Sequence, residues 1–303
     1  MFKDIKQTIE KLKKENYISS AEIATTVYLA LKMEKPILVE GPAGVGKTEL
    51  GKCVSAALNL ELIRLQCYEG LDEAKALYEW EYAKQLLYTQ ILKDKLSVIL
   101  KKEKTLLAAT KKLSKSEDVF FSEKFLIARP ILKSISSPKK SVLLIDEIDK
   151  SDSEFEAFLL EVLSDFQVTI PEIGTIKAKK KPLVILTSNN AREMSDALKR
   201  RCLHLYINYP TQDLEKQIVA LKVPEANPKL IEKIVKAVHK IRGYELKKEP
   251  SISETLDWTK SLLILGYKSL DHPEIYKTLN LILKYEKDIE LIKKNSHEIF
   301  HDQ

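Results

Sequence analysis

Short runs of apolar residues recur along the chain and are typical of buried strands in a parallel sheet. The clearest are PILVE at 36–40, SVLLID at 141–146 and PLVILTS at 182–188, and we expect ELIRLQ at 61–66 and LHLYINY at 203–209 to join the same sheet. Polar residues and then a helical pattern follow each of the first three runs. This alternation predicts an α/β fold with a parallel sheet flanked by helices.

The pattern changes after Pro210. From Thr211 onward the spacing of apolar residues is helical, and no further run reads as a strand. One helical stripe contains Leu230, Ile231, Ile234, Val235 and Val238. We therefore divide the chain into an α/β domain, residues 1–210, and an all-helical domain, residues 211–303.

A long insertion rich in Leu, Ala, Lys and Glu lies between two of the predicted strands, at about residues 71–115. We expect a charged helical hairpin with one solvated face. A nucleic-acid surface is the alternative, but no aromatic residues that could stack on bases are interleaved with its lysines. Those lysines are Lys101, Lys102, Lys104, Lys111, Lys112 and Lys115.

The composition narrows the class of protein. Among 303 residues the net charge is only +6, which permits contact with nucleic acid or acidic proteins without indicating either. Cys53, Cys67 and Cys202 share no metal-ligand or redox spacing, and we expect reduced thiols in the cytoplasm. The histidines are scattered, so no metal cluster is expected. No apolar run approaches about 18 residues, and we expect neither export nor a membrane span.

The strongest motif is GPAGVGKTEL at 41–50, which fits G-x-x-x-x-G-K-[ST] and lies between a predicted strand and a predicted helix. Its glycines let successive N–H groups surround a phosphate, and the helix adds the positive end of its dipole. Lys47 is expected to reach the β- and γ-phosphates, and the Thr48 hydroxyl to ligate Mg²⁺. The expected nucleotide-binding residues are Gly41, Pro42, Ala43, Gly44, Val45, Gly46, Lys47, Thr48 and Glu49.

Two carboxylates, Asp146 and Glu147, follow the apolar strand SVLLID. The carboxyl edge of an open parallel sheet is where such folds bind ligands. We expect Asp146 to hold Mg²⁺ through water and Glu147 to act as the general base for an attacking water. A guanine nucleotide is disfavoured because the chain lacks an Asn-Lys-x-Asp motif. Together with the phosphate loop, the pair predicts ATP hydrolysis.

The next segments have structural interpretations. Ser153 and Glu156 are predicted to form a capping box for a helix with an apolar face. FQVTIPEIGTIKA then predicts a β-hairpin with Gly174 at its turn, either an extension of the sheet or a projection that contacts a substrate or neighbour. The strand PLVILTS ends in two asparagines. We expect Asn189, with Asn190 as the second choice, to bind the γ-phosphate or align the lytic water.

In this order the segments resemble the AAA+ ATPases. They correspond to Walker A at 41–48, Walker B at 142–147, sensor 1 at Asn189, an arginine near Arg201 and a helical lid. The stretch DEIDKSDSEFEAFLLEVLSDFQVTIPEIGTIKAKKKPLVILTSNN resembles the MoxR branch. QCYEGLDEAKALYEWEYAKQLL, SEKFLIARPIL and SISETLDW are similar to MoxR-type ATPases that help to mature carbon monoxide dehydrogenase.

The resemblance implies a Mg²⁺-dependent ATPase that forms a ring, often a hexamer. It also implies chaperone-like remodelling or metallocofactor insertion on a protein client, frequently with a partner that carries a von Willebrand factor A domain. One feature departs from the family: Ile252 and Ser253 stand where many relatives carry the sensor 2 arginine. Lys247 or Lys248 is the candidate to replace it.

Arg200 and Arg201 are adjacent in a chain where only six of 50 basic residues are arginine. The resemblance places Arg201 at the family's arginine-finger position, on the opposite flank of its own subunit from the phosphate loop. Such a cation can act only in trans, on the γ-phosphate held by a neighbouring subunit. Arg200 would be a second contact or a positioning residue. The alternative is a pair of surface arginines in weak ion pairs.

Two other functions stay open. A nucleic-acid-acting AAA+ protein, similar to a clamp loader or helicase loader, would use the insertion and the lysines Lys177, Lys179, Lys180 and Lys181. A nucleotide-gated scaffold without hydrolysis is the other, and the intact Asp146–Glu147 pair argues against it.

Overall fold

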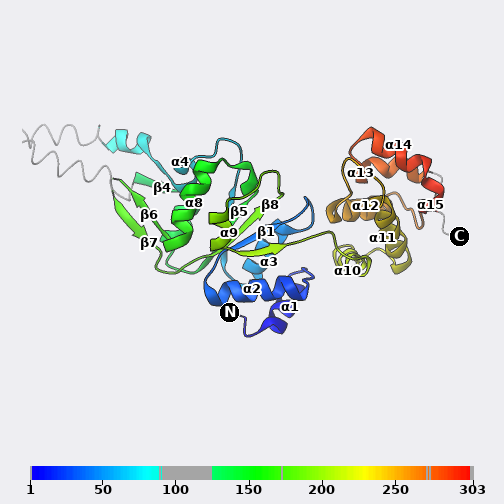
Figure 1. The fold of residues 1–303 in the computed structure, drawn as a ribbon, viewed down its shortest axis with the longest axis horizontal. Coiled ribbons are helices and arrows are strands. Elements are labelled where there is room, and N and C mark those ends of the chain that lie inside the picture. The colour runs from blue at the N-terminus through cyan, green and yellow to red at the C-terminus, as the bar shows by residue number, and fades with distance from the viewer. Residues whose placement is uncertain are drawn as a thin grey trace, which may run out of the picture.

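A computed structural model describes residues 2–88, 90, 125–171, 173–270, 272 and 274–300. Its centre is a five-stranded sheet in the order β2-β5-β8-β1-β9, with all neighbours parallel (Figure 1). The strands are β1 (Ile37–Glu40), β2 (Glu61–Gln66), β5 (Ser141–Asp146), β8 (Leu183–Ser188) and β9 (Leu203–Tyr206). The predicted parallel sheet is therefore confirmed.

Three strands, β1, β5 and β8, are buried along their whole length. Helices cover both faces of a parallel sheet, which is why these segments are continuous apolar runs rather than alternating ones. The edge strand β2 instead alternates buried and exposed positions. In the register, Gln66 pairs with Asp146 and Glu40 with Ser188, so the polar strand ends share one edge of the sheet.

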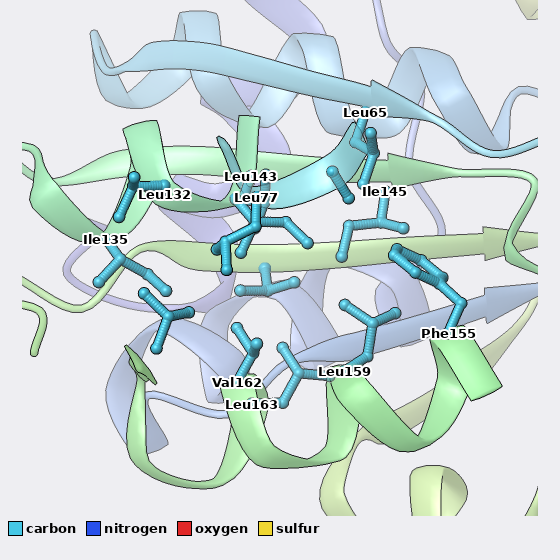
Figure 2. Packing of buried hydrophobic residues seen from close by; sticks show 14 of the residues in the cluster. Leu65, Leu77, Leu132, Ile135, Leu143, Ile145, Phe155, Leu159, Val162 and Leu163 are labelled. Atoms are coloured by element: carbon cyan, nitrogen blue, oxygen red, sulfur yellow. The ribbon is translucent and has the colours of Figure 1, made fainter. Parts of the chain in front are cut away.

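Helices α1 (Ile5–Lys14), α2 (Ala21–Met33) and α3 (Lys47–Leu58) pack on one face of the sheet. The other face is covered by α4 (Glu73–Leu77), α7 (Pro130–Ser136), α8 (Ser153–Asp165) and α9 (Asp196–Arg201). Figure 2 shows how this second core is built: leucines and isoleucines of α7 and β5 meet Phe155, Leu159 and Val162 of α8.

The predicted helical hairpin at 71–115 is wrong in its first part. The chain there forms α4 and the strand β3 (Tyr78–Trp80), which pairs antiparallel with β4 (Leu126–Ala128). Ala76, Leu77 and Trp80 are buried in the core, so the segment is not a solvated face. Residues 82–88 are helical, as predicted, and Tyr82, Leu86 and Leu87 there are exposed. The lysines of the insertion from Lys101 to Lys115 lie outside the described residues.

The predicted β-hairpin is confirmed. Strands β6 (Gln167–Ile170) and β7 (Gly174–Lys177) pair antiparallel as a separate two-stranded sheet, so they do not extend the central one. Gly174 begins β7 with a φ of 96°, a value that favours glycine. The hydroxyls of Thr169 and Thr175 lie 3.1 Å apart across the pair.

The capping box at Ser153 is wrong by one residue. Asp152 caps α8, and its Oδ1 accepts a hydrogen bond of 2.8 Å from the backbone of Phe155. Glu156 faces away from the helix start. Its carboxylate accepts from the backbone of Ser195 at 2.8 Å and from Arg192 at 2.9 Å, and it ties α8 to the segment after β8.

The described residues that follow β9 contain helices but no strand. These helices gather at one end of the molecule in Figure 1, and we refer to them as the lid. Trp258 is fully buried at their centre and donates to Thr278 Oγ1 at 2.8 Å. The helices are α10 (Gln212–Lys222), α11 (Pro228–Arg242), α12 (Ile252–Ile264), η3 (Ile275–Thr278), α13 (Leu279–Ile282), α14 (Glu286–Lys294) and α15 (Ser296–Phe300). Within the described part of the chain, every helix is too short or too polar to cross a bilayer.

Candidate nucleotide site

The loop between β1 and α3 depends on its glycines. Gly41, Gly44 and Gly46 have φ values of 145°, 76° and 94°, which L side chains rarely adopt. A Cβ on Gly41 would lie 2.0 Å from the carbonyl oxygen of Ile207, and one on Gly44 would lie 2.2 Å from Ser251 Oγ. The glycines therefore let two other segments of the chain pack directly on the loop.

Lys47 begins α3 and is 6% exposed. Its Nζ donates to the carbonyl oxygens of Gly41, at 2.7 Å, and Pro42, at 2.6 Å. Burial lowers the pKa of Lys47 to about 8, while the carboxylates of Asp149 and Asp146 act in the opposite direction. The ammonium is held inside the loop, where charged phosphate oxygens would be stronger acceptors than carbonyls.

Asp146, at the end of β5, is 1% exposed and both of its oxygens are bonded. Oδ1 accepts from the Thr48 hydroxyl at 2.8 Å and from the Thr187 hydroxyl at 2.6 Å. Oδ2 accepts from Arg64 of β2, with its Nε at 3.1 Å. The two predicted metal ligands, Thr48 and Asp146, are thus in direct contact.

Glu147 has a left-handed backbone, with φ 58° and ψ 51°, which is uncommon outside glycine. Its backbone N–H donates to Thr187 Oγ1 at 2.9 Å. The carboxylate Oε2 accepts from Gln66 Nε2 at 2.9 Å and lies 2.6 Å from Lys150 Nζ. The strand ends of β2, β5 and β8 therefore fix the position of this acid together.

Asn189 follows β8 and is held through its backbone. Asp149 Oδ2 accepts from the N–H groups of Asn189, at 3.1 Å, and Ala191, at 3.0 Å. Asp149 is 5% exposed, and this buried carboxylate orders the loop that carries the asparagine. Asn190, the second choice, is exposed, has a φ of 59° and lines neither of the two cavities at the loop.

Two adjoining cavities meet at the loop. A polar cavity of about 250 Å³ is lined by Ala43, Gly44, Gly46, Lys47, Thr48, Glu49, Lys52, Glu147, Thr187, Asn189 and Ser253. A more apolar cavity of about 470 Å³ shares Gly44, Gly46, Glu49 and Ser253 with it. The second cavity extends between Tyr17 and Ile18 on one side, Tyr209 of the β9–α10 connection, and Ile218 of α10. A phosphate chain with an attached aromatic base matches this pair of compartments.

Comparison with known families decides the class. Residues 36–202, which include β1, both acids and Asn189, match the model of the AAA domain, dynein-related subfamily. The chain belongs to this AAA family. The match ends just after Arg201, and the fold around it is that of an AAA+ P-loop NTPase with a C-terminal helical region.

Relatives are found among staphylococcal proteins. An uncharacterised protein of Staphylococcus haemolyticus is 28% identical over 261 residues, which is 84% of this chain and 85% of that protein. One of Staphylococcus epidermidis is 27% identical over 78% of each chain. Among solved structures, a single-residue variant of RuvB from Thermotoga maritima covers 100% of this chain and 81% of that one, with 17% identity and a TM-score of 0.51. This likeness concerns the AAA+ fold.

Most of the predicted AAA site residues come together. Lys47, Thr48, Glu147 and Asn189 line the polar cavity. Val45 is buried and lines the apolar cavity. Gly41 and Pro42 line neither cavity, but their carbonyls hold Lys47. Glu49 borders both cavities and forms an ion pair of 2.9 Å with Lys222 of the lid.

Arg200 and Arg201 are not brought to the AAA site of their own chain. They end α9, which packs on the face of the sheet opposite α3. Both side chains are exposed, and Arg201 donates to Ser164 Oγ at 2.6 Å and to the carbonyl of Ala197 at 3.2 Å. They line neither cavity, as expected of residues on the opposite flank.

Neither lysine proposed to replace sensor 2 reaches the loop. Lys248 forms an ion pair of 2.8 Å with Glu254, and Lys247 lies 4.0 Å from the ring centroid of Tyr285. Instead, Ser253 of α12 lies beside the loop and donates to the carbonyl of Gly44 at 3.4 Å. The side chain of α12 that contacts the loop is therefore a hydroxyl and not a cation.

Sequence reasoning missed five residues that complete the AAA site. Gln66 and Arg64 hold the two acids from β2, and the alternation of polar residues along that strand was the available signal. Asp149 follows Asp146 by three residues, and this spacing was the available signal for a third acid at the same sheet edge. Tyr17 and Tyr209 carried no signal, because distant segments bring them to the apolar cavity.

The residues fit a magnesium nucleotide. Hydroxyl and carboxylate oxygens are the donors that Mg²⁺ prefers, and Mg²⁺ usually takes few protein ligands beside water and phosphate. Thr48 and Asp146 supply such a pair. The loop is a cradle that a Cβ at Gly41 or Gly44 would fill, and its buried ammonium suits an anion.

Proposed function

We propose that the chain is an ATPase that hydrolyses ATP with Mg²⁺ and uses the energy to remodel a protein client. One observation supports this above the others: Glu147 and Asn189 line the same polar cavity as Lys47 and Thr48. A protein that only bound nucleotide would have no use for an acid and an amide facing the phosphates.

In this mechanism, Lys47 donates to the β- and γ-phosphate oxygens, and Thr48 and Asp146 hold Mg²⁺. The metal, when bound, neutralises charge on the phosphate oxygens. Gln66 and Lys150 both engage Oε2 of Glu147, so Oε1 is the oxygen we assign to accept the proton of the attacking water. Asn189 orients that water or the γ-phosphate.

We further propose that the larger cavity takes the adenine base. Its walls are mainly apolar, and its tyrosines can face an aromatic ring. Because the cavity includes residues of α10 and α12, the base would contact both the α/β core and the lid. We also keep the division into domains at 1–210 and 211–303 as a proposal.

We assign the working form to a ring, with the hexamer as the preferred size. The exposed Arg200 and Arg201 on α9 support this, because arginines remote from their own nucleotide can stabilise charge only on that of a neighbour. Arg201 is the proposed arginine finger, and Arg200 its second contact or positioning residue.

Within the AAA family we propose the MoxR branch and a role in metalloenzyme maturation. Strand β6 packs on the core through Val168 and Ile170, and the largely exposed β7 is available to touch a client or neighbour. A partner with a von Willebrand factor A domain and a cytoplasmic location complete the proposal. They rest on the sequence resemblance and on three cysteines that are all unpaired.

The decisive experiment is Glu147→Gln. We expect the rate of ATP hydrolysis to fall by at least about 100-fold, because the general base is lost, while ATP affinity stays within about twofold. Steady-state phosphate release and equilibrium binding of a fluorescent ATP analogue measure the two quantities. Glu161→Gln, on the exposed side of α8, is the matched control. Unchanged hydrolysis in Glu147→Gln would contradict the mechanism.

The second function, a nucleic-acid-acting ATPase, is supported by one surface. Lys177 at the end of β7 and the following Lys179 and Lys180 are exposed, and Lys181 lies 3.4 Å from Glu34. Binding through lysines would depend strongly on salt and should stimulate turnover. An ATPase rate that is unchanged by single- and double-stranded DNA at low salt rules this function out.

A further inference from the structure

A charged cluster is buried inside the lid. Glu215 of α10 is fully buried, and Arg242 of α11 is bidentate to it, with Nη1–Oε2 at 2.6 Å and Nη2–Oε1 at 2.9 Å. His239 Nε2 lies 2.9 Å from Oε2, and the Thr255 hydroxyl of α12 donates to Oε1 at 2.7 Å. The cluster thus joins α10, α11 and α12.

The same groups hold the start of α12. Arg242 Nε donates to the carbonyl of Pro250 at 2.7 Å. The Thr255 hydroxyl also lies 3.1 Å from the carbonyl of Ser251. Since Ser251 and its neighbours pack on Gly44, the cluster determines where the lid touches the phosphate-binding loop.

Arg242 also faces the wall of the larger cavity. Its guanidinium lies 4.9 Å from the ring centroid of Tyr209, a cation–π distance, and Tyr209 lines that cavity. One arginine is therefore in contact with two segments that border the nucleotide site, the β9–α10 connection and the start of α12. Arg242 itself lines neither cavity.

Stability alone does not explain the cluster. Removing two charges from water is costly, and apolar residues of similar size often stabilise a buried position as well or better. The three helices already share apolar cores. A charged pair also fixes the relative positions of the helices, because each hydrogen bond from the planar guanidinium constrains where its acceptor lies.

We propose that Arg242 is a positioning residue that sets the lid against the nucleotide site through Tyr209 and the start of α12. The inference rests on the proposed nucleotide binding and adds to it the residue that couples the lid to the nucleotide.

The test is Arg242→Lys, which keeps the charge and removes the planar fork. We expect KM for ATP and the dissociation constant of a fluorescent ATP analogue to rise about tenfold, which is the size of effect typical of residues that are in contact and coupled. We expect kcat to change less than about twofold. Arg129→Lys is the matched control, since Arg129 forms an exposed ion pair with Glu79. The affinity of the Arg129→Lys variant for the ATP analogue should equal that of the wild type.

A second series guards against a lid that fails to fold. Thr255→Val keeps the ion pair and removes one bond to Glu215, and it should raise KM about threefold. Tyr209→Leu removes the aromatic ring that Arg242 contacts and should weaken binding of the ATP analogue. In the Tyr209→Leu background, Arg242→Lys should have a smaller effect than alone. Fluorescence of Trp258 in a Trp80→Phe background reports whether the lid is folded.

The outcomes separate the two proposals. A wild-type protein that binds no ATP overturns the proposed function. A wild-type protein that binds ATP, with folded Arg242→Lys and Thr255→Val variants of equal affinity, overturns only the role of Arg242. Equal effects of Arg242→Lys with and without the Tyr209 ring would overturn the path through that ring.

Discussion

Arginine is scarce in this chain, and its six copies differ sharply in their surroundings. Four form an ion pair with a carboxylate: Arg64 with Asp146, Arg129 with Glu79, Arg192 with Glu156 and Arg242 with Glu215. Arg200 and Arg201 have no carboxylate partner among the described residues. Surface arginines in weak ion pairs were the alternative interpretation of this pair, and this arrangement does not support it. Two guanidinium groups without a carboxylate partner in the described part of the chain suit an external anion.

Asp149 has a defined role at the scale of a single residue. It is buried, and one of its oxygens accepts both backbone N–H groups that order the loop of Asn189. We expect Asp149→Ala to lower the free energy of unfolding by about 2 kcal/mol, because two donors lose a charged acceptor. Turnover should fall while ATP affinity is retained. Urea unfolding and phosphate release measure these effects.

Asp152→Ala is the control for that prediction. Asp152 caps α8, away from both cavities, and its loss should cost about 1 kcal/mol without a change in turnover per folded molecule. If Asp149→Ala affects only stability in the same way, Asp149 does not position Asn189 for catalysis.

At the scale of elements, the phosphate loop and α12 are fitted to each other. A Cβ at Gly44 would fall 2.2 Å from Ser251 Oγ, whereas a Cβ at Gly70 meets nothing within 4 Å. Both glycines have a positive φ, of 76° and 79°, so alanine costs about 1–2 kcal/mol of backbone strain at either position. Gly44 borders both cavities and meets the lid, whereas Gly70 does neither.

We expect Gly44→Ala to weaken ATP binding at least about tenfold, because α12 must move away from the loop, and Gly70→Ala to bind ATP normally. Isothermal calorimetry on both variants measures the difference. Similar affinities in the two variants would mean that the lid does not contribute to the site.

The bounds of the helices and strands show how much secondary structure the local sequence patterns predict. The bounds of β2 and β5 agree with their apolar runs, and β8 differs only by Pro182, which cannot donate to the ladder. The start of α8 was misplaced because Asp152 and Ser153 are both good N-caps, and the carboxylate of Glu156 is used elsewhere. The segment at 71–80 was misread because its alanines and leucines suit a solvated helix as well as a buried one.

The proposed nucleotide residues lie at the carboxyl edge of the sheet and at the start of α3, whereas the candidate finger ends α9 on the face opposite α3. We expect Arg201→Ala and Lys47→Ala to be inactive separately. Mixed in equal amounts, they should recover about a quarter of the wild-type rate, because half of the subunits keep Lys47 and half of their neighbours keep Arg201. Phosphate release after co-assembly measures the recovery. Mixed rings that stay inactive would exclude catalysis in trans by Arg201.

The sequence by itself determined the central sheet and which polar residues lie at its carboxyl edge. Buried strands must be apolar, and a phosphate loop must be glycine-rich, so both leave a local pattern that can be read without coordinates. Lys47, Thr48, Asp146, Glu147 and Asn189 were all identified in this way.

The tertiary structure alone decided which distant groups hold those residues. Gln66 against Glu147, Ser253 against Gly44 and Arg242 against Tyr209 join segments that are far apart in the chain. A polar side chain at a strand end or helix start looks the same in sequence whether it faces water or a partner. Only the packing of the sheet and lid shows which one it meets.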